Sequence, residues 1–427
     1  MHKYFMYRIY FYSLLTFICL FFYNSFYSND FFILIGEIIS PLLISLLLVL
    51  IGSLNFLKKN NVVLHLYAYI LFFAISIFSY LGLAGNITGS HASSSNPLIY
   101  GLSFYTAYLA FVIFKQDLSL KKIFISANPI ILISGPMPVI FKAIPSSFIS
   151  RIKYYFPFLV IGFFFFKVIS APMTYYLEML NNTSPLVIFL FAILFRIFLY
   201  FNFAGISLMA YGILGIFGTK IPLNFTQPFT SRSVVEFWRS WHVALSIVLK
   251  TLFYDPVKKI SGSTYLAILI VYLSSAAWHG VSINFLYWGL IHAVAFLITI
   301  QLLKKNQGIL AGILLLLAIP IGDVMFTDTN IPRLTEKIAN FFILDLYTLP
   351  SIDELISAIL ITPKYVLAST GVALSIVCIE FFGYHQKIIA KRNYKFLRTK
   401  PAQLMIYFLM LLLLSGQGLE YAAYGQR

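Results

Sequence analysis

Charged residues are scarce in this chain. Its 427 residues include 30 Lys and Arg and only 14 Asp and Glu, so that 10% are charged while 60% are hydrophobic. A soluble domain carries roughly 25% charged residues, and a mean hydropathy of +0.89 is too apolar for a water-facing surface. This shortage of charge excludes a soluble enzyme, a disordered protein and a coiled coil. Alternating strands of about ten residues are also lacking, which argues against an outer-membrane barrel.

Cysteines and the signature motifs of common enzymes are equally sparse. The two cysteines, Cys19 and Cys378, lie within apolar runs, which is typical of small apolar positions rather than of a disulfide framework or a metal site. We find no P-loop, no dinucleotide fingerprint, no His-Glu-x-x-His motif and no Gly-x-Ser-x-Gly elbow. The acidic residues are too scattered for a glycosidase carboxylate pair. We therefore expect no metal and no tightly bound cofactor.

Long apolar runs fill the chain instead. A membrane helix needs about 20 consecutive apolar residues, and eleven segments approach or exceed this length. They predict an all-α polytopic membrane protein that forms a single membrane domain over residues 1–427. The first segment is interpreted as a helix, because its core is too long for a signal peptide and lacks a cleavage site. The predicted spans are residues 5–27, 31–57, 62–84, 98–114, 155–179, 186–217, 264–281, 283–303, 308–326, 354–382 and 402–424.

Lys and Arg are concentrated in alternate connections between these spans. If the N-terminus is cytoplasmic, the cytoplasmic connections hold 24 of the 30 basic residues, and the outer side holds only Arg333, Lys337 and Arg427. This bias follows the positive-inside rule, so it explains the formal net charge of +16 without a nucleic-acid partner. The distribution predicts a multi-pass protein of the inner (cytoplasmic) membrane with a cytoplasmic N-terminus and lipids as its surroundings.

Two of the predicted cytoplasmic stretches do not look like simple loops. Residues 123–141 are apolar but interrupted by Asn-Pro and Gly-Pro pairs, as expected of a segment that enters and leaves the membrane on one side. Residues 232–254 lie in a long mixed connection and form a second candidate re-entrant segment, because long loops tend to be functional. On the outer side, residues 327–353 predict no more than a small surface helix near Phe341–Tyr347.

Aromatic and imidazole side chains gather in one part of the sequence. All four tryptophans fall between positions 238 and 288, and three of the seven histidines lie within or just beyond this window. This is the densest polar-aromatic cluster of the chain, and we expect its chemistry to be found here. The residues concerned are Trp238, Trp241, His242, Trp278, His279, Trp288 and His292.

His279 is the first candidate for a catalytic base. It ends an apolar span, and an ionisable residue at membrane depth is a functional hypothesis by default. Burial disfavours the charged imidazole, and the neutral ring can accept a proton from a hydroxyl nucleophile. The alternative is a buried histidine with a hydrogen-bond partner, or one that lies at the membrane interface.

His242 is the second candidate. It follows Arg239 by three residues on a predicted amphipathic helix that also carries Glu236. An i,i+3 pair between Glu236 and Arg239 would leave the neighbouring tryptophans to line a tunnel. The alternative is a helix at the headgroups with its aromatic and basic side chains at the interface.

Two further polar residues have a structural interpretation. His292 lies one turn beyond Trp288 on the same helix face, which favours packing or hydrogen bonding over contact with substrate. Arg196 lies in the middle of a predicted span and needs a partner there, either an acidic side chain or a ligand phosphate. We favour a structural ion pair.

An ordered series of motifs resembles one known family. The motifs are Phe237–Ser246, Trp278–Gly280 and Tyr287–His292, preceded by Gly101–Thr106, Ser134–Pro136, Tyr200–Gly205 and Pro222–Phe229. The series is similar to the membrane-bound O-acyltransferase (MBOAT) family, and more closely to its bacterial branch with alginate O-acetylase and the teichoic-acid D-alanylation membrane protein. The resemblance covers roughly residues 98–300, and residues 1–97 and 301–427 are expected to form flanking helices.

The resemblance implies a many-helix fold around a central tunnel, with re-entrant segments near its middle. It implies that His279 is the family's near-invariant histidine and that His242 is the second histidine of the bacterial branch, both catalytic. At Asn202 and Leu208 the branch usually has acidic residues, so any role of a carboxylate there is lost. The residues expected to line the tunnel and bind substrate are Trp238, Arg239, Trp241, Trp278, Trp288 and Asn202.

The function implied by the resemblance is acyl transfer from a thioester to a hydroxyl, with His279 as the general base. We expect an acetyl group to pass from a cytoplasmic donor, acetyl-CoA or a carrier-protein phosphopantetheine, to an extracytoplasmic envelope glycan or polymer. A periplasmic or extracellular transferase is a possible partner. The alternatives are D-alanyl transfer from a carrier protein, a flippase or transporter for a lipid-linked substrate, and a membrane subunit that has lost activity.

Overall fold

The computed structural model describes the central and C-terminal parts of the chain. Three predicted spans, 5–27, 31–57 and 98–114, and the predicted re-entrant segment 123–141 lie outside the described residues. Span 62–84 is represented by three of its residues. The described residues are 66, 69–70, 142–280, 282–347, 349–385 and 394–413.

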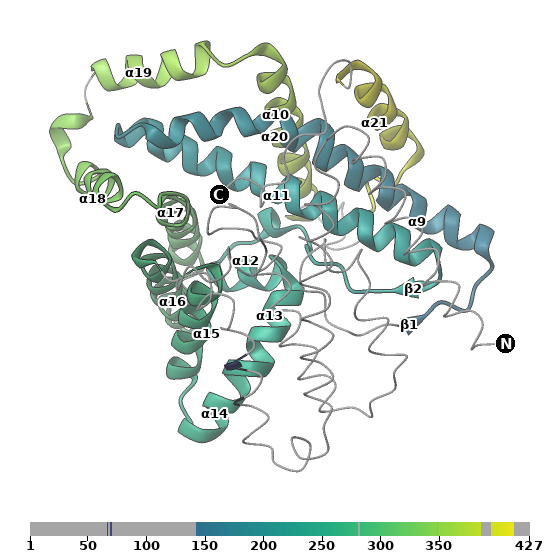
Figure 1. Ribbon diagram of the computed structural model, residues 1–427, viewed down its shortest axis with the longest axis horizontal. Coiled ribbons are helices and arrows are strands. Elements are labelled where there is room, and N and C mark those ends of the chain that lie inside the picture. The colour runs from purple at the N-terminus through teal and green to yellow at the C-terminus, as the bar shows by residue number, and fades with distance from the viewer. Residues whose placement is uncertain are drawn as a thin grey trace, which may run out of the picture.

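Two long helical segments form an antiparallel hairpin at the centre of the described fold (Figure 1). The first runs without a break from Phe148 to Asn181 and comprises α9 (Phe148–Phe163), the π-helix Phe164–Ser170, α10 (Ala171–Met173) and the 3₁₀-helix Thr174–Asn181. The second is α11 (Pro185–Ile216). Strands β1 (Lys142–Ala143) and β2 (Thr219–Lys220) pair antiparallel at the open end, in the register Lys142 with Lys220.

Glycines let the two arms of this hairpin approach closely. A Cβ atom on Gly162 would lie 2.6 Å from the carbonyl oxygen of Gly205 and from the amide nitrogen of Met209. A Cβ on Gly205 would lie 2.7 Å from the amide nitrogen of Phe166. Small residues at helix contacts strengthen packing in a membrane, where there is no hydrophobic driving force between helices. Gly205 therefore ends the motif Tyr200–Gly205 for a structural reason.

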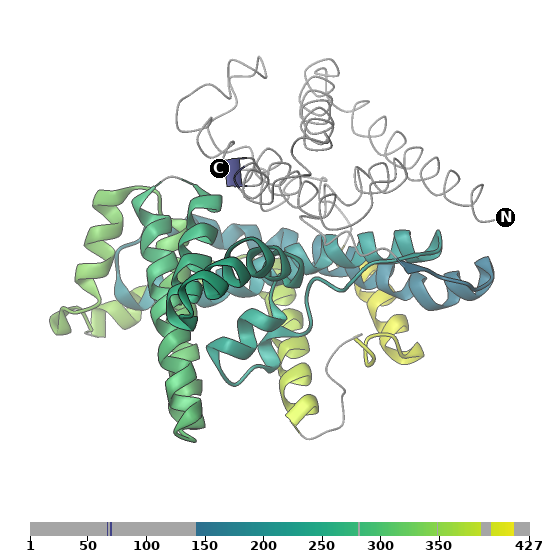
Figure 2. The same cartoon turned by 90° about the horizontal axis from the view of Figure 1, so that it is seen from below.

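The remaining described helices lie around this hairpin, with α19 and α21 above it and α12 to α16 below it in the view of Figure 1. In Figure 2, α16, α17 and α20 run across the direction of α9 and α11. After the 3₁₀-helix Pro228–Thr230 come α12 (Val234–Ser240), α13 (Val243–Leu249), the π-helix Lys250–Tyr254, α14 (Asp255–Ser261), α15 (Thr264–His279), α16 (Ile283–Lys304), α17 (Gly308–Thr327), α18 (Ile331–Asn340), the 3₁₀-helix Leu344–Leu346, α19 (Leu349–Leu360), α20 (Lys364–His385) and α21 (Lys400–Leu413).

The all-α polytopic membrane fold is confirmed. Among the described residues five helices are long and apolar enough to cross a membrane, namely Phe148–Asn181, Pro185–Ile216, Ile283–Lys304, Gly308–Thr327 and Lys364–His385. The predicted span 264–281 is a shorter apolar helix, α15. The total of eleven spans, the orientation and the central tunnel remain predictions. Tyr69, one of the described residues of span 62–84, contacts the π-helix Lys250–Tyr254, since its hydroxyl donates to the Leu252 carbonyl at 2.7 Å.

Two predicted boundaries are wrong. Residues 354–382 are not one span, because α19 and α20 are separate helices with Thr362-Pro363 between them. Proline lacks an amide donor and disfavours helical backbone at the residue before it, so the helix ends there and restarts at Lys364. The surface helix predicted near Phe341–Tyr347 lies earlier, as α18, and the predicted segment holds only the 3₁₀-helix Leu344–Leu346. Helix α21 accounts for the beginning of span 402–424, whose remainder lies outside the described residues.

The close contact at Gly162 predicts that an added methyl group destabilises the protein there but not at an uncrowded glycine. Gly162→Ala should lower the unfolding temperature of the detergent-solubilised protein, because overpacking against backbone atoms costs about 1–3 kcal/mol. Gly371→Ala in α20 is the matched control, since a Cβ there meets nothing within 4 Å and alanine favours helix by about 1 kcal/mol. Equal unfolding temperatures for the two variants would contradict the close approach.

Candidate functional site

The segment predicted as one amphipathic helix is broken at the site. Ser233 caps α12 by accepting a hydrogen bond from the Glu236 amide at 3.2 Å, and the Glu236 carboxylate accepts from the Arg232 amide at 2.9 Å. These two contacts fix the helix start in a variant of the capping box, in which Glu236 reaches the amide of the residue before the cap. Helix α12 then ends at Ser240, and His242 adopts a left-handed conformation, with φ of 44°, before α13 begins.

The expected helix joining Glu236, Arg239 and His242 is therefore wrong. Glu236 serves the helix start, where a negative charge is favourable, and no ion pair joins it to Arg239 in the described part of the chain. Arg239 is exposed. Of the tunnel-lining residues inferred from sequence, it is the one that the structure shows as exposed.

His242 is buried and held by Asn224. Its Nδ1 lies 3.0 Å from the Asn224 Oδ1, and the same oxygen accepts from the Ala244 amide at 3.1 Å. The ring packs edge-on against Phe203, with centroids 4.7 Å apart, and stacks on Phe225 at 6.3 Å. Burial lowers the pKa of His242 to about 3, so its imidazole is neutral at physiological pH.

Trp241 packs against a buried ion pair. Its indole stacks on Phe237 with a centroid distance of 5.5 Å, and the Arg196 guanidinium carbon lies 4.6 Å from its ring centre, as in a cation–π contact. Arg196 Nε donates to Asp323 Oδ2 at 2.8 Å, and a second contact joins Arg196 Nη2 to Asp323 Oδ1. Both side chains are buried. The structural ion pair favoured for Arg196 is present, and it joins α11 to α17.

His279 ends α15 inside a set of aromatic rings. Its imidazole is half-buried and lies 4.6 Å from the Trp278 ring, 4.8 Å from Phe326 and 5.2 Å from Trp288, measured between centroids. Gly280 follows with φ of 157°, and a Cβ there would lie 2.7 Å from the Phe285 ring. The glycine of the Trp-His-Gly motif thus allows the chain to leave the helix without displacing that ring.

His292 lies between the two histidine sites. It is fully buried on α16, with ring centroids 4.9 Å from Trp238 and 5.0 Å from Trp288. A Cβ on Gly322 of α17 would collide with its Nε2, so the absence of a side chain there makes room for the imidazole. Neither ring nitrogen has a hydrogen-bond partner among the described residues. The packing interpretation of His292 fits these contacts.

The structure brings the predicted cluster together as one chain of ring contacts. From His279 the contacts pass through Trp288, Trp238, Phe237, Trp241 and Phe225 to His242. Trp278 joins at the His279 end. His279 and His242 therefore belong to one aromatic cluster but lie at its two ends, separated by tryptophans rather than in mutual contact.

Asn202 has a contact of its own. Its side-chain amide donates to the Ser170 hydroxyl at 3.3 Å, which joins α11 to the π-helix of the neighbouring arm. The Ser170 hydroxyl in turn donates to the Phe166 carbonyl at 2.6 Å. The residue after Asn202, Phe203, packs on His242. The contact with Ser170 gives Asn202 a role in helix packing beside the site.

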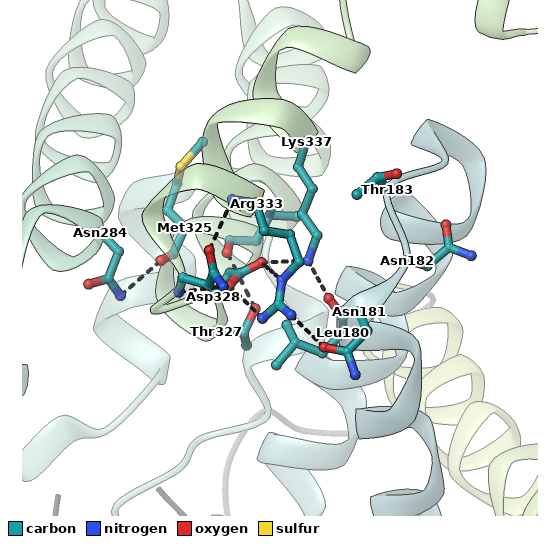
Figure 3. A network of polar contacts seen from close by, with 12 residues as sticks. Leu180, Asn181, Asn182, Thr183, Asn284, Met325, Thr327, Asp328, Arg333 and Lys337 are labelled. Atoms are coloured by element: carbon teal, nitrogen blue, oxygen red, sulfur yellow. Dashed lines mark hydrogen bonds and ion pairs between the residues drawn. The ribbon is translucent and has the colours of Figure 1, made fainter.

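Asp328, two residues after the Phe326 that packs on His279, is the centre of a network of ion pairs (Figure 3). Asp328 accepts hydrogen bonds from Arg333 Nε and Nη2, both at 2.8 Å, and from Lys337 Nζ at 2.7 Å. Lys337 also donates to the Leu180 carbonyl and Arg333 to the Asn181 side chain, so α18 is fastened to the end of the first hairpin arm. Burial alone would raise the pKa of Asp328, but the hydrogen bonds from Arg333 and Lys337 outweigh it and lower the pKa.

Comparison with known proteins assigns the family. The sequence model of MBOAT, the membrane-bound O-acyltransferase family, matches residues 2–306. The chain belongs to this family. The matched region contains both histidine sites and the whole cluster of tryptophans, whereas Asp323, Asp328 and α18 to α21 lie beyond it.

Individual relatives within the MBOAT family match shorter stretches. The chain is 39% identical to a peptidoglycan O-acetyltransferase of Helicobacter pylori over 102 residues, which are 23% of this chain and 19% of the relative. It is 31% identical to a probable alginate O-acetylase of Azotobacter vinelandii over 163 residues, 36% and 33% of the two chains. It is 30% identical to a teichoic acid D-alanyltransferase of Streptococcus thermophilus over 121 residues, 26% and 29% of the two chains. The chain thus spans about a fifth to a third of the length of these relatives.

Several residues of this MBOAT site were not identified from sequence. Asn224 stands in the motif Pro222–Phe229, but its contact with His242 depends on the turn between α12 and α13. Asp323 and Glu380 each lie in a predicted span, and an acid at membrane depth is a sufficient signal to single them out. Glu380 is fully buried on α20 beside Gln227 and Tyr200. No group of His, Cys, Asp and Glu side chains suited to a metal ion occurs within the described ranges.

The Arg196–Asp323 pair gives a stability prediction. Arg196→Leu leaves Asp323 buried without a counter-charge and should destabilise the protein by about 3–5 kcal/mol. The double variant Arg196→Leu/Asp323→Leu should recover most of this loss, because neither charge remains buried. Thermal unfolding of the detergent-solubilised variants measures both effects. A double variant no more stable than the single one would show that the ion pair is not the cause.

The Asp328 network predicts a loss of stability in acid. Because its pKa is lower in the folded protein than the ordinary value of 3.8, the carboxylate stabilises the fold above that value, and this contribution is lost as the pH falls through the folded pKa. The unfolding temperature should therefore drop between about pH 5 and pH 2 by more in the wild type than in Asp328→Asn. Parallel curves for the two proteins would contradict a lowered pKa.

Proposed function

We propose that this protein transfers an acyl group from a thioester to a hydroxyl group of a cell-envelope polymer. Family membership supports the reaction class. The relatives are named for O-acetylation of peptidoglycan and alginate and for D-alanylation of teichoic acid, and all three names describe an acyl group placed on an envelope polymer. The observation that carries the proposal is the position of His279, an imidazole at a helix end enclosed by rings from α15, α16 and α17.

His279 is the general base of the proposed reaction. A neutral imidazole removes the proton from the acceptor hydroxyl while its oxygen bonds to the thioester carbonyl carbon. The tetrahedral intermediate then collapses, the carbon–sulfur bond breaks, and the departing thiolate takes the proton back from the imidazolium. The ring cage formed by Trp278, Trp288 and Phe326 keeps water away from the reacting thioester. The products are the ester and a free thiol.

The donor is proposed to arrive from the cytoplasmic side and the acceptor from the outer side. Exposed basic residues on the segment that carries α12 to α14, Arg239 and Lys259 among them, would attract the phosphates of a coenzyme A thioester or a phosphopantetheine. We propose acetyl as the acyl group, with D-alanyl as the enzymatic alternative. An inner-membrane location with a cytoplasmic N-terminus, and a periplasmic or extracellular transferase as partner, complete the proposal.

Replacement of His279 tests this function directly. His279→Ala in proteoliposomes should lower acyl transfer to an envelope polymer by about 10²–10⁴-fold, the usual contribution of a general base. His385→Gln on α20 is the matched control, because glutamine can still donate to the Thr230 carbonyl that His385 Nε2 faces at 3.0 Å. Mass spectrometry of the polymer distinguishes an acetyl from an alanyl increment.

Three outcomes contradict parts of the proposal. A folded His279→Ala protein with full activity removes His279 as the base. Movement of unmodified substrate across the vesicle membrane without any acylation identifies a transporter instead. An absence of both activities, in wild-type protein supplied with each donor class, excludes the reaction itself.

A further inference from the structure

The hydrogen bonds around Asn224 determine which way its amide points. Its Oδ1 accepts from the Ala244 backbone amide at 3.1 Å, and of the two side-chain amide atoms only the oxygen can accept from a backbone N–H. On the other side, its Nδ2 donates to the Ser207 hydroxyl at 3.2 Å. The two contacts agree, so the oxygen and not the nitrogen of the amide faces His242.

This orientation determines the tautomer of the imidazole. The Asn224 oxygen lies 3.0 Å from His242 Nδ1, and an acceptor requires a donor opposite it, so Nδ1 carries the proton. A neutral imidazole has one N–H, which leaves the lone pair on Nε2. His242 Nε2 is buried and has no hydrogen-bond partner among the described residues. A buried acceptor without a partner is unfavourable, so this atom is suited to a donor that arrives with a ligand.

We propose that Asn224 is a positioning residue that holds His242 as the Nδ1–H tautomer, so that His242 Nε2 accepts a hydrogen bond from an O–H, N–H or S–H group of a substrate. The inference rests on the proposed acyl transfer. In the same way, the aspartate of Ser-His-Asp enzymes accepts from the histidine Nδ1–H and leaves Nε2 to accept a proton. It also excludes His242 Nε2 as a donor to an oxyanion while the ring is neutral.

Asn224 also has a structural role, which the experiment must distinguish from its proposed control of the His242 tautomer. Asn224 also supports the left-handed turn at His242, because its backbone carbonyl accepts from the Val243 amide at 2.8 Å. A substitution at position 224 keeps the hydrogen bond to its backbone carbonyl, whereas it changes or removes the hydrogen bonds of the side chain. Asn224→Asp keeps both acceptor contacts in nearly the same shape and adds a charge. Asn224→Leu removes them, and Ser207→Ala removes only the contact at Nδ2.

The charge of Asn224→Asp makes a pH measurement informative. Among the described residues, the ring and hydrogen-bond contacts of the His242 side chain are with Phe203, Phe225 and Asn224, which come from α11 and from the segment before α12 and carry no titratable group. Ser207 of α11, behind Asn224, does not titrate in this range either. A carboxylate at position 224 stabilises the imidazolium and raises the pKa of His242. Since only the neutral ring accepts at Nε2, the acid limb of the activity profile should move to higher pH.

The experiment uses the full chain in nanodiscs with ¹⁵N-labelled histidine. The His242 signals, assigned by their loss in His242→Gln, should show Nδ1–H and an unprotonated Nε2 in the wild type and in Ser207→Ala. In Asn224→Leu, His242 should show a mixture of tautomers. The acyl-transfer rate should be at least about tenfold lower than that of the wild type, which is a fraction of the roughly 10²–10⁴-fold that a general base typically contributes. Asn224→Asp should remain active with its acid limb shifted. Separate KM values for donor and acceptor identify which substrate bonds to Nε2.

Either of two results overturns the inference. One is an Nε2–H tautomer of His242 in the wild type. The other is a folded Asn224→Asp protein whose pH profile matches that of the wild type. Because the tautomer is read from the spectrum, a protein without acyl-transfer activity would overturn the proposed function while the spectrum still decides the state of His242. If Asn224→Leu does not fold, the wild-type spectrum and Asn224→Asp remain decisive.

Discussion

The buried ion pair between Arg196 and Asp323 holds the two halves of the site in register. Arg196 belongs to the central hairpin and Asp323 to α17, so their contact fixes α17 against α11. The guanidinium also lies over the ring of Trp241, the residue before His242. On the other side of the pair, Gly322 precedes Asp323 and faces His292. One interaction thus sets the distance between the turn at His242 and the helices that carry His292 and His279.

Burial of this turn is demanding, because a buried polar group without a partner costs about 1–3 kcal/mol. The backbone of the turn between α12 and α13 forms hydrogen bonds with the segment before α12. The Thr226 amide donates to the Ser240 carbonyl at 2.9 Å, and the backbone carbonyl and Oδ1 of Asn224 accept from the Val243 and Ala244 amides. The aromatic rings between the two histidines fill the remaining space without adding polar atoms that need partners, apart from the indole nitrogens. The ring cluster and the polar turn therefore depend on each other.

The sequence predicted the parts of this protein that depend on local pattern. The apolar runs located most of the long helices within two residues, although the first arm of the hairpin begins at Phe148, well before the predicted span 155–179. The run 354–382 failed because the helix breaks at Thr362-Pro363. Hydropathy does not show this break, and proline alone does not predict it, since Pro157 and Pro320 lie inside α9 and α17. The pairing of Arg196 followed from the energetic need for a counter-charge, but its partner lies 127 positions away in the chain and no local pattern names it. The contact between Asn224 and His242 could not be predicted from the sequence for a related reason. It exists only because the helix breaks after Ser240, and the amphipathic pattern predicted that the helix continues.

The Asp328 network also accounts for the exception to the charge bias. Arg333 and Lys337 lie on the side predicted to be poor in basic residues, and both bond to one buried carboxylate that offsets part of their charge. Phe326, which packs on His279, is two residues before Asp328, so the His279 end of the ring cluster lies under α18. His242 lies at the other end, in the segment predicted to face the cytoplasm. In the proposed orientation an acceptor from the outer side therefore approaches the ring cluster at its His279 end and a donor from the cytoplasm at its His242 end.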